Sequence, residues 1–331
     1  METVVSGIRP TGNLHLGNYF GMVKNSVEMQ RNFHCYFFVA DYHSLTTHPH
    51  PADLHNTVRH VVSEYLACGI DPEKSVLYIQ SDIPETTELY TFLNMLAYVG
   101  ELERSTSFKE KVRSQPDNVN AGLLTYPVLM AADILIHKAI KVPVGKDQTQ
   151  HLEFTRNFAQ RFNNLYGVDY FPLPQAFNFS TELVKVPGLD GAGKMGKSEG
   201  EGNAIFLTDK PEVIRKKVMR AVTDSGPTKP NQQKPEPIQN LFMLMNLVSA
   251  PETVQHFDEA YNNCTIRYGD MKKQLAEDMI TFTHPIREKV ITYYHDTEFL
   301  HKVLSMGEEK ARASAAKTVK EVREIIGIRK F

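Results

Sequence analysis

Residues 13–18 read Asn-Leu-His-Leu-Gly-Asn, and residues 194–198 read Lys-Met-Gly-Lys-Ser. The first segment follows residues 3–8, which are apolar enough for a buried strand, and it leads into residues 16–27, whose pattern fits a helix. Glycines in a strand–turn–helix let the backbone approach a nucleotide closely, and the free N–H groups of a helix start attract phosphate. Together the two segments predict a nucleotide-binding α/β protein.

The second segment places two lysines in a run of glycines. Lys194 and Lys197 flank Met195 and Gly196, and ammonium groups on a mobile loop can close over a triphosphate and stabilise departing pyrophosphate. His15 of the first segment can donate to a phosphate oxygen whose charge grows in the transition state. The plainer alternatives are a capped turn with a surface histidine and a solvated basic loop.

Residues 191–198 also match the Gly-x-x-x-x-Gly-Lys-Ser pattern of P-loop nucleotide hydrolases. That loop needs a strand immediately before it and a helix immediately after it. Residues 184–188 make a poor strand and residues 199–203 make a poor helix start. The context therefore disfavours this interpretation.

Composition limits the class of protein. The 331 residues are enough for two domains, and a hydrophobic content of 41% supports a sizeable core. No apolar run approaches the roughly 20 residues of a membrane span, and the start lacks the apolar core of a signal peptide. The three cysteines form neither a disulfide framework nor a zinc pattern. A cytoplasmic protein is expected, and the net charge of −2 gives no bulk basic character.

Strand-like and helix-like stretches alternate through the first half, which predicts a mainly parallel, doubly wound sheet. After the strand at 3–8, the remaining strands are expected at 35–40, 75–80 and 141–144, and the helices at 53–68, 86–99, 121–138 and 147–166.

The second half reads differently. Residues 223–237 contain four prolines and are expected to form an exposed loop. The pattern beyond them is helical, which predicts a second, all-helical domain. Its helices are expected at 238–249, 251–262, 270–282, 284–304 and 308–326. The expected division is 1–190 for the sheet domain, 191–204 for the mobile two-lysine loop and 205–304 for the helical domain, with a C-terminal helix at about 305–331 completing the first.

Ligands of such sheets bind beyond the carboxyl ends of the strands. His15, Asp41, Gln80 and Asp147 all lie at or just past predicted strand ends. Asp147 is equally well placed as a helix N-cap. His43, two residues beyond Asp41, either lines a pocket or satisfies a loop carbonyl.

One predicted helix carries a buried acid. Tyr126, Met130 and Asp133 stand at i, i+4 and i+7 and therefore share a face. Asp133 lies among apolar residues, where a carboxylate needs a partner. That partner is either an N–H group of a substrate or a cation elsewhere in the chain.

Taken together, these segments resemble the bacterial-type tryptophanyl-tRNA synthetases, which are class I aminoacyl-tRNA synthetases. The resemblance covers most of the chain in the family's order. The matching segments are 6–19, 100–104 (Gly-Glu-Leu-Glu-Arg), 108–111 (Phe-Lys-Glu-Lys), 123–135, 142–153, 194–198 and 221–225 (Ala-Val-Thr-Asp-Ser).

The resemblance implies a Rossmann-like fold and a tryptophan pocket. In it, Asp133 would accept the indole N–H and Gln148 would hold the amino group. The walls would be formed by Val5, His43, Tyr126, Met130, Val142 and Val144.

It also implies an ATP site in which magnesium is carried by the phosphates and not by a protein metal site. The catalytic residues would be His15, Lys111, Lys194 and Lys197. The ATP contacts would be Arg9, Gly17, Asn18, Asp147, Gln148, Lys194, Met195, Lys197 and Ser198.

The implied partners are tryptophan, ATP, a tRNA read through its anticodon by the helical domain, and a second copy of the chain in a homodimer. Five residues depart from the family's usual pattern, and they bear on affinity more than on the reaction: Val5, Arg9, Asn18, Lys146 and Gly196. The sequence thus predicts a tryptophan–tRNA ligase. The alternatives are a tyrosyl-tRNA synthetase and a catalytically silent synthetase-like binding protein.

Overall fold

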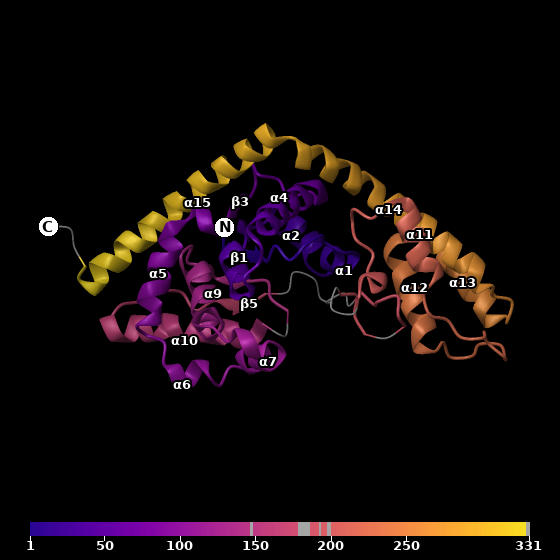
Figure 1. Ribbon diagram of the computed structural model, residues 1–331, viewed down its shortest axis with the longest axis horizontal. Coiled ribbons are helices and arrows are strands. Elements are labelled where there is room, and N and C mark those ends of the chain that lie inside the picture. The colour runs from indigo at the N-terminus through magenta and orange to yellow at the C-terminus, as the bar shows by residue number, and fades with distance from the viewer. Residues whose placement is uncertain (146–147, 178–185, 192, 197–199, 329–331) are drawn as a thin grey trace.

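The computed structural model of the chain describes residues 1–145, 148–177, 186–191, 193–196 and 200–328, without the side chain of residue 201 (Figure 1).

The centre of the fold is a parallel sheet with the order β3-β2-β1-β4-β5. Its strands are β1 (Thr3–Ile8), β2 (His34–Val39), β3 (Val76–Ile79), β4 (Lys141–Val142) and β5 (Gln175–Ala176). The predicted doubly wound sheet is therefore confirmed. The short strand β5 was not predicted, because it is only two residues long and exposed. The strand order reverses between β1 and β4, and the crevice at such a reversal is where ligands of this fold class bind.

Both faces of the sheet are buried, which explains why its strands read as continuous apolar runs. On β2, Cys35 and Phe37 belong to one core cluster, whereas Tyr36 and Phe38 belong to the other. The first face is covered by α2 (Lys24–Met29) and α4 (Pro51–Cys68), and the second by α5 (Pro84–Asn94), α9 (Tyr126–Leu135) and α10 (Thr149–Tyr166).

Three predicted helices are interrupted. The helix expected at 16–27 consists of α1 (Leu16–Asn18), a π-helical turn at Tyr19–Val23, and α2. The helix expected at 86–99 ends at Asn94 and is followed by the short α6 (Val99–Leu102). The helix expected at 121–138 divides into α8 (Ala121–Leu124) and α9, because Pro127 at the start of α9 favours a new helix there. The polar α7 (Thr106–Ser114) completes this half.

The second half is helical, as predicted, with α11 (Pro211–Met219), α12 (Glu236–Val248), α13 (Pro251–Asn262), α14 (Tyr268–His295) and α15 (Thr297–Ile326). The predicted breaks at 283 and at 305–307 were wrong, and the chain instead breaks at Asp296. α14 continues through Pro285 because that residue and Thr281, whose carbonyl loses its hydrogen bond, are both exposed. None of the described helices is long and apolar enough to cross a membrane.

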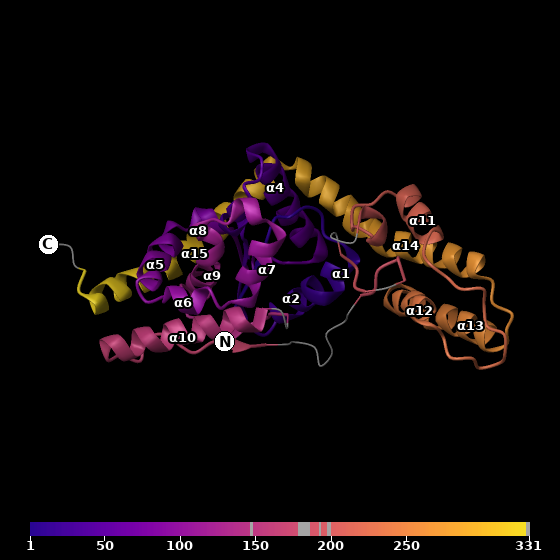
Figure 2. The same ribbon diagram turned by 60° about the horizontal axis from the view of Figure 1, so that its bottom comes forward.

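The two long helices α14 and α15 meet at an angle and run along one side of the molecule (Figure 1). α15 packs on β3 and α5, α14 packs on α4 near the bend between the two long helices, and α11 to α13 gather around the opposite end of α14. Figure 2 shows the same division from another side. One core cluster runs from sheet residues such as Val4 to Ile238 of α12 and Leu275 of α14. The boundaries expected at 190, 204 and 304 stay a prediction.

α15 also covers the edge strand β3. A Cβ built on Gly307 would lie 1.8 Å from the Leu77 carbonyl oxygen, so the helix backbone rests directly on the strand. Covering an edge removes a row of unpaired backbone groups from solvent.

Candidate active site

The turn after β1 is held rigidly around His15. Its Nδ1 accepts a hydrogen bond from the Asn18 backbone N–H at 3.3 Å, and Asn18 Oδ1 accepts one from the His15 N–H at 3.1 Å. His15 also bridges to Phe206 in antiparallel fashion, with the two rings edge to face. The imidazole is 8% exposed, so it is not the surface histidine of the plainer alternative.

The two motifs of the sequence meet in space, although they are about 180 residues apart. A Cβ built on Gly17 would lie 2.7 Å from His15 Nδ1 and 3.4 Å from the Met195 carbonyl oxygen. Met195 is anchored by its N–H, which donates to the Val186 carbonyl at 2.8 Å, and its side chain is buried in the core. Lys194 beside it is exposed. Of the predicted site residues, Asp147, Lys197 and Ser198 lie outside the described part of the chain.

A cavity of about 270 Å³ lies at the strand-order reversal, between the ends of β1 and β4 and the start of α9. All of the predicted tryptophan-pocket residues line it, as does Arg9. These residues are Val5, His43, Tyr126, Met130, Asp133, Val142, Val144 and Gln148. A larger, open groove of about 880 Å³ lies between α5 and the end of α15, but no predicted site residue lines it.

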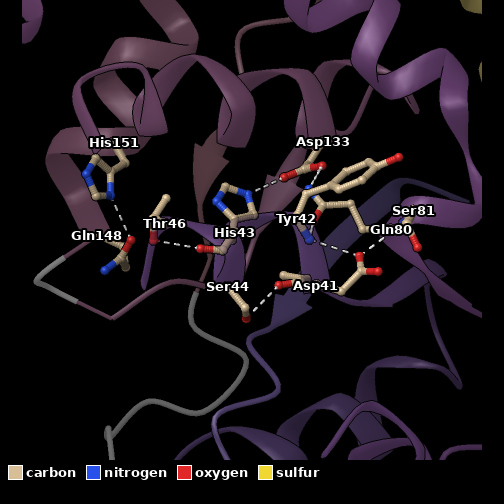
Figure 3. Close-up of polar contacts among 11 residues, drawn as sticks. Asp41, Tyr42, His43, Ser44, Thr46, Gln80, Ser81, Asp133, Gln148 and His151 are labelled. Atoms are coloured by element: carbon tan, nitrogen blue, oxygen red, sulfur yellow. Dashed lines mark hydrogen bonds and ion pairs between the residues drawn. The ribbon is translucent and has the colours of Figure 1, made fainter. Parts of the chain in front are cut away.

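Asp133 is the buried acid of this cavity, at 3% exposure (Figure 3). Its Oδ2 lies 2.7 Å from His43 Nε2, and its Oδ1 accepts a hydrogen bond of 2.7 Å from Gln80 Nε2. Burial raises the pKa of Asp133, and the hydrogen bonds from His43 and Gln80 oppose that rise. The protein itself thus supplies part of the partner that this carboxylate needs, because His43 and Gln80 each hold one of its oxygens.

Gln80 was not predicted as a site residue, although its place after a strand was noted. Its Oε1 accepts the Tyr42 N–H at 3.1 Å while its Nε2 donates to Asp133. The side chain is buried and both ends of its amide are used, so its orientation is fixed. The only sequence signal was its position just beyond β3.

A second series of polar side chains, joined by short contacts, extends from the cavity to α7. Gln148 Oε1 lies 2.8 Å from His151 Nδ1 (Figure 3). On the other side of the ring, His151 Nε2 lies 2.7 Å from Ser107 Oγ on α7. His151 is buried and was not predicted, since it reads as one more polar residue on α10. Lys111, predicted to be catalytic, is on the exposed face of α7 and does not line the cavity.

Arg9 gives the cavity a positive charge. Its Nε is buried and has no hydrogen-bond partner among the described residues. Burial raises the pKa of Tyr126, and the nearby Arg9 guanidinium lowers it. An unpaired guanidinium N–H facing a cavity favours an anionic ligand group such as a carboxylate or a phosphate.

The geometry is thus a strand–turn–helix of the kind that binds nucleotides, beside a largely apolar cavity that contains the buried Asp133 carboxylate. Residues 2–284 match the sequence profile of the class I tRNA synthetases (W and Y). A relative in Porphyromonas gingivalis, named tryptophan–tRNA ligase, is 63% identical over 329 residues, covering 99% of this chain and 100% of the relative. The chain belongs to the tryptophanyl-tRNA synthetase family.

Other members of the tryptophanyl-tRNA synthetase family also match this chain over nearly its whole length. The tryptophan–tRNA ligase of Helicobacter pylori is 42% identical, over 99% of both chains. A crystal structure of tryptophanyl-tRNA synthetase from Campylobacter jejuni, complexed with ADP and tryptophan, is 34% identical with a TM-score of 0.89. It covers 98% of this chain, and this chain covers 99% of it. The likeness therefore extends over both the sheet and the helical half.

Proposed function

We infer that this protein is a tryptophan–tRNA ligase: it activates tryptophan with ATP and transfers it to the 3′-terminal adenosine of a tRNA. The observation that carries this conclusion is the buried Asp133 carboxylate, held by His43 and Gln80 in an apolar cavity beside the His15 turn. The extent of similarity to the tryptophan–tRNA ligases supports the same reaction. No observation favours the tyrosyl enzyme or a silent binding protein.

In the proposed amino-acid site, Asp133 accepts the indole N–H. Each of its oxygens retains a lone pair beyond the one that His43 or Gln80 occupies. The ring is enclosed by Val5, His43, Tyr126, Met130, Val142 and Val144. Gln148 also lines the cavity and holds the amino group of the ligand.

In the proposed activation step, the tryptophan carboxylate attacks the α-phosphate of MgATP, the bond to the β-phosphate breaks, and pyrophosphate leaves. Arg9 lies where it can orient the carboxylate or the α-phosphate. The absence of a side chain at Gly17 lets the His15 ring and the Met195 carbonyl pack against this turn. His15 and the loop lysines stabilise charge that grows on the phosphates. Positioning and charge stabilisation suffice, so no covalent intermediate with the enzyme is needed.

The remaining ATP contacts are proposed by family membership. Asn18 and Asp147 would hold the adenosine, and Lys111, Lys194 and Lys197 would meet the triphosphate with Mg²⁺. Because Lys111 lies on the exposed α7, its role requires that α7 or the loop close over bound ATP.

The partners are proposed in the same way. The helical half under α14 would bind the anticodon of the tRNA, and the chain would form a homodimer. Met95, Tyr98 and Val99 are exposed by more than half at the junction of α5 and α6, which makes this junction a candidate for the dimer contact. Light scattering would give the mass of the particle, and Tyr98→Glu should convert a dimer to a monomer. A cytoplasmic location stays a prediction.

The first experiment is ATP–pyrophosphate exchange with tryptophan and tyrosine in parallel. Exchange with tryptophan alone is the expected result. Exchange with tyrosine alone would retain the fold and overturn the amino-acid assignment, and exchange with neither would support a silent binding protein. Aminoacylation of total tRNA with labelled tryptophan then tests the transfer step.

A further inference from the structure

Glu64 is a carboxylate in the middle of the apolar face of α4. It is 0% exposed and is surrounded on its helix by the core residues Val61, Val62 and Tyr65. Burying a charged group costs several kcal/mol unless it is paired and hydrogen-bonded. An apolar residue would serve the packing of α4 equally well, so the acid needs another explanation.

The partner of Glu64 is the backbone of the His15 turn. The Leu14 N–H donates to Glu64 Oε1 at 2.9 Å and to Oε2 at 3.0 Å. The Leu14 carbonyl accepts a hydrogen bond of 2.9 Å from the Leu207 N–H. The residue immediately before His15 is therefore clamped from both sides, by α4 and by the segment after the lysine loop.

We propose that Glu64 is a positioning residue for ATP activation, which acts by fixing the turn that carries His15 and Gly17. This inference rests on the proposed function. His15 can reach the triphosphate only if its backbone is correctly positioned. The peptide groups of Leu14, the residue before His15, determine that position. A displacement of about 1 Å at a reacting group can cost about 100-fold in rate.

The position of the Glu64 oxygens, and not the charge, carries the effect. A negative charge beneath a turn that receives phosphates would by itself disfavour ATP. His60 Nε2 lies 3.3 Å from Glu64 Oε1, although it is not aligned for a hydrogen bond, and it places a second polar group against the acid. A neutral acceptor of the same length should therefore replace the carboxylate.

Glu64 does not line the amino-acid cavity. Its helix covers the face of the sheet that belongs to the first core cluster, whereas the cavity residues Val5 and Val142 belong to the second. Loss of Glu64 should consequently affect the ATP-dependent step and leave tryptophan binding unchanged.

The test uses three substitutions at one site and a neighbouring control. Glu64→Met nearly conserves the volume and removes the acceptor, Glu64→Asp keeps the charge but withdraws the oxygens, and Glu64→Gln keeps an acceptor in place. Ser63→Ala is the control, because Ser63 is buried on the same helix but, among the residues that the structure describes, its Oγ bonds only the Arg59 carbonyl. Each variant is assayed by tryptophan-dependent exchange, by tryptophan binding and by thermal unfolding. The chain contains no tryptophan, so the fluorescence of the bound amino acid, excited at the long-wavelength edge where tyrosine does not absorb, is read without a contribution from the protein.

Glu64→Met and Glu64→Asp should each lower kcat/KM for ATP by about 100-fold, with the tryptophan Kd unchanged. Glu64→Gln and Ser63→Ala should resemble the wild type. If Glu64→Met does not fold, Glu64→Asp decides the question. Wild-type exchange in the folded variants would overturn the inference, as would an equal loss of tryptophan binding. A wild-type protein without tryptophan-dependent exchange would overturn the proposed function and this inference with it.

Discussion

His43 and Asp133 are 90 residues apart in the sequence, yet a hydrogen bond of 2.7 Å joins His43 Nε2 to Asp133 Oδ2 inside the buried cavity. Gln80 holds the other carboxylate oxygen at the same distance. An acceptor fixed in advance does not have to reorient when a ligand N–H arrives, which is the arrangement that gives the greatest electrostatic stabilisation. In the proposed amino-acid site, this arrangement selects a side chain whose ring carries an N–H group.

The first prediction concerns Asp133 itself. Asp133→Ala should lower kcat/KM for tryptophan by at least about 100-fold, because a site built around a substrate N–H discriminates strongly against its loss. The KM for ATP should change little. Exchange kinetics at varied tryptophan concentration provide the measurement, and Met130→Leu is the control, because it alters the same cavity at nearly constant volume. Kinetics in Asp133→Ala equal to those of the control would remove Asp133 from the site.

The second prediction concerns the lysine loop. Lys194 is exposed next to Met195, whose carbonyl lies close to Gly17. Lys194→Ala should lower kcat for activation by about 100-fold, since it removes a donor that acts on departing pyrophosphate, while tryptophan binding is retained. We expect the same of Lys197→Ala, which lies outside the described residues. Lys210→Ala, at an exposed position before α11, is the matched control. Equal losses in rate and in tryptophan binding would contradict a role in the transition state.

The third prediction is a pH dependence of stability. His137 is buried, with Nε2 3.0 Å from the Tyr78 hydroxyl and Nδ1 3.1 Å from Ser314 Oγ on α15. Burial, with a smaller contribution from His34, lowers the pKa of His137 from 6.5 to about 3. Between these values the unfolded chain binds a proton that the native protein does not, so this contribution to stability is present above pH 6.5 and is lost as the pH falls.

His137→Gln removes the titrating group and keeps a polar side chain for Tyr78 and Ser314. Between about pH 8 and about pH 5, the free energy of unfolding of the wild type should fall relative to this variant. The limiting slope below the unfolded pKa is about 1.4 kcal/mol per pH unit. Urea unfolding of both proteins across the range measures the difference. A difference that does not vary with pH would mean that the pKa of His137 is the same in the native and the unfolded protein.

The strands β1 to β4 and one face of the cavity were predictable from local patterns, whereas the remaining wall residues came from the family resemblance. Apolar runs such as 35–40 identify buried strands, and the i, i+4, i+7 spacing places Tyr126, Met130 and Asp133 on one face. In a parallel sheet the ends of such strands meet at one edge, so residues that follow them are brought together without any further signal.

The residues that hold the site in place were not predictable in this way. Gln80 contacts Asp133 across 53 residues, and Glu64 contacts Leu14 across 50. On its own helix Glu64 looks like a polar interruption of an apolar face. Nothing local to these residues encodes the partner, since each contact depends on how two elements pack.

The predicted helix ends failed for a related reason, because local rules for proline and glycine were applied without tertiary context. Gly307 was expected to lie in a break between two helices. It lies instead within α15, where the absence of a side chain allows the helix to rest on Leu77 of β3. The residue that disfavours a helix locally is the one that the packing of α15 requires.

This contact gives the fourth prediction. Alanine is favoured over glycine in a helix by up to about 1 kcal/mol, yet Gly307→Ala should destabilise the protein by about 1–3 kcal/mol, because its Cβ would force α15 away from the sheet. Gly269→Ala is the matched control: Gly269 also lies in a long helix, α14, and a Cβ there meets nothing within 4 Å. In thermal and urea unfolding, the midpoint of Gly307→Ala should fall below that of the wild type. The midpoint of Gly269→Ala should rise or stay unchanged. A Gly307→Ala protein as stable as Gly269→Ala would show that α15 does not rest on β3 in solution.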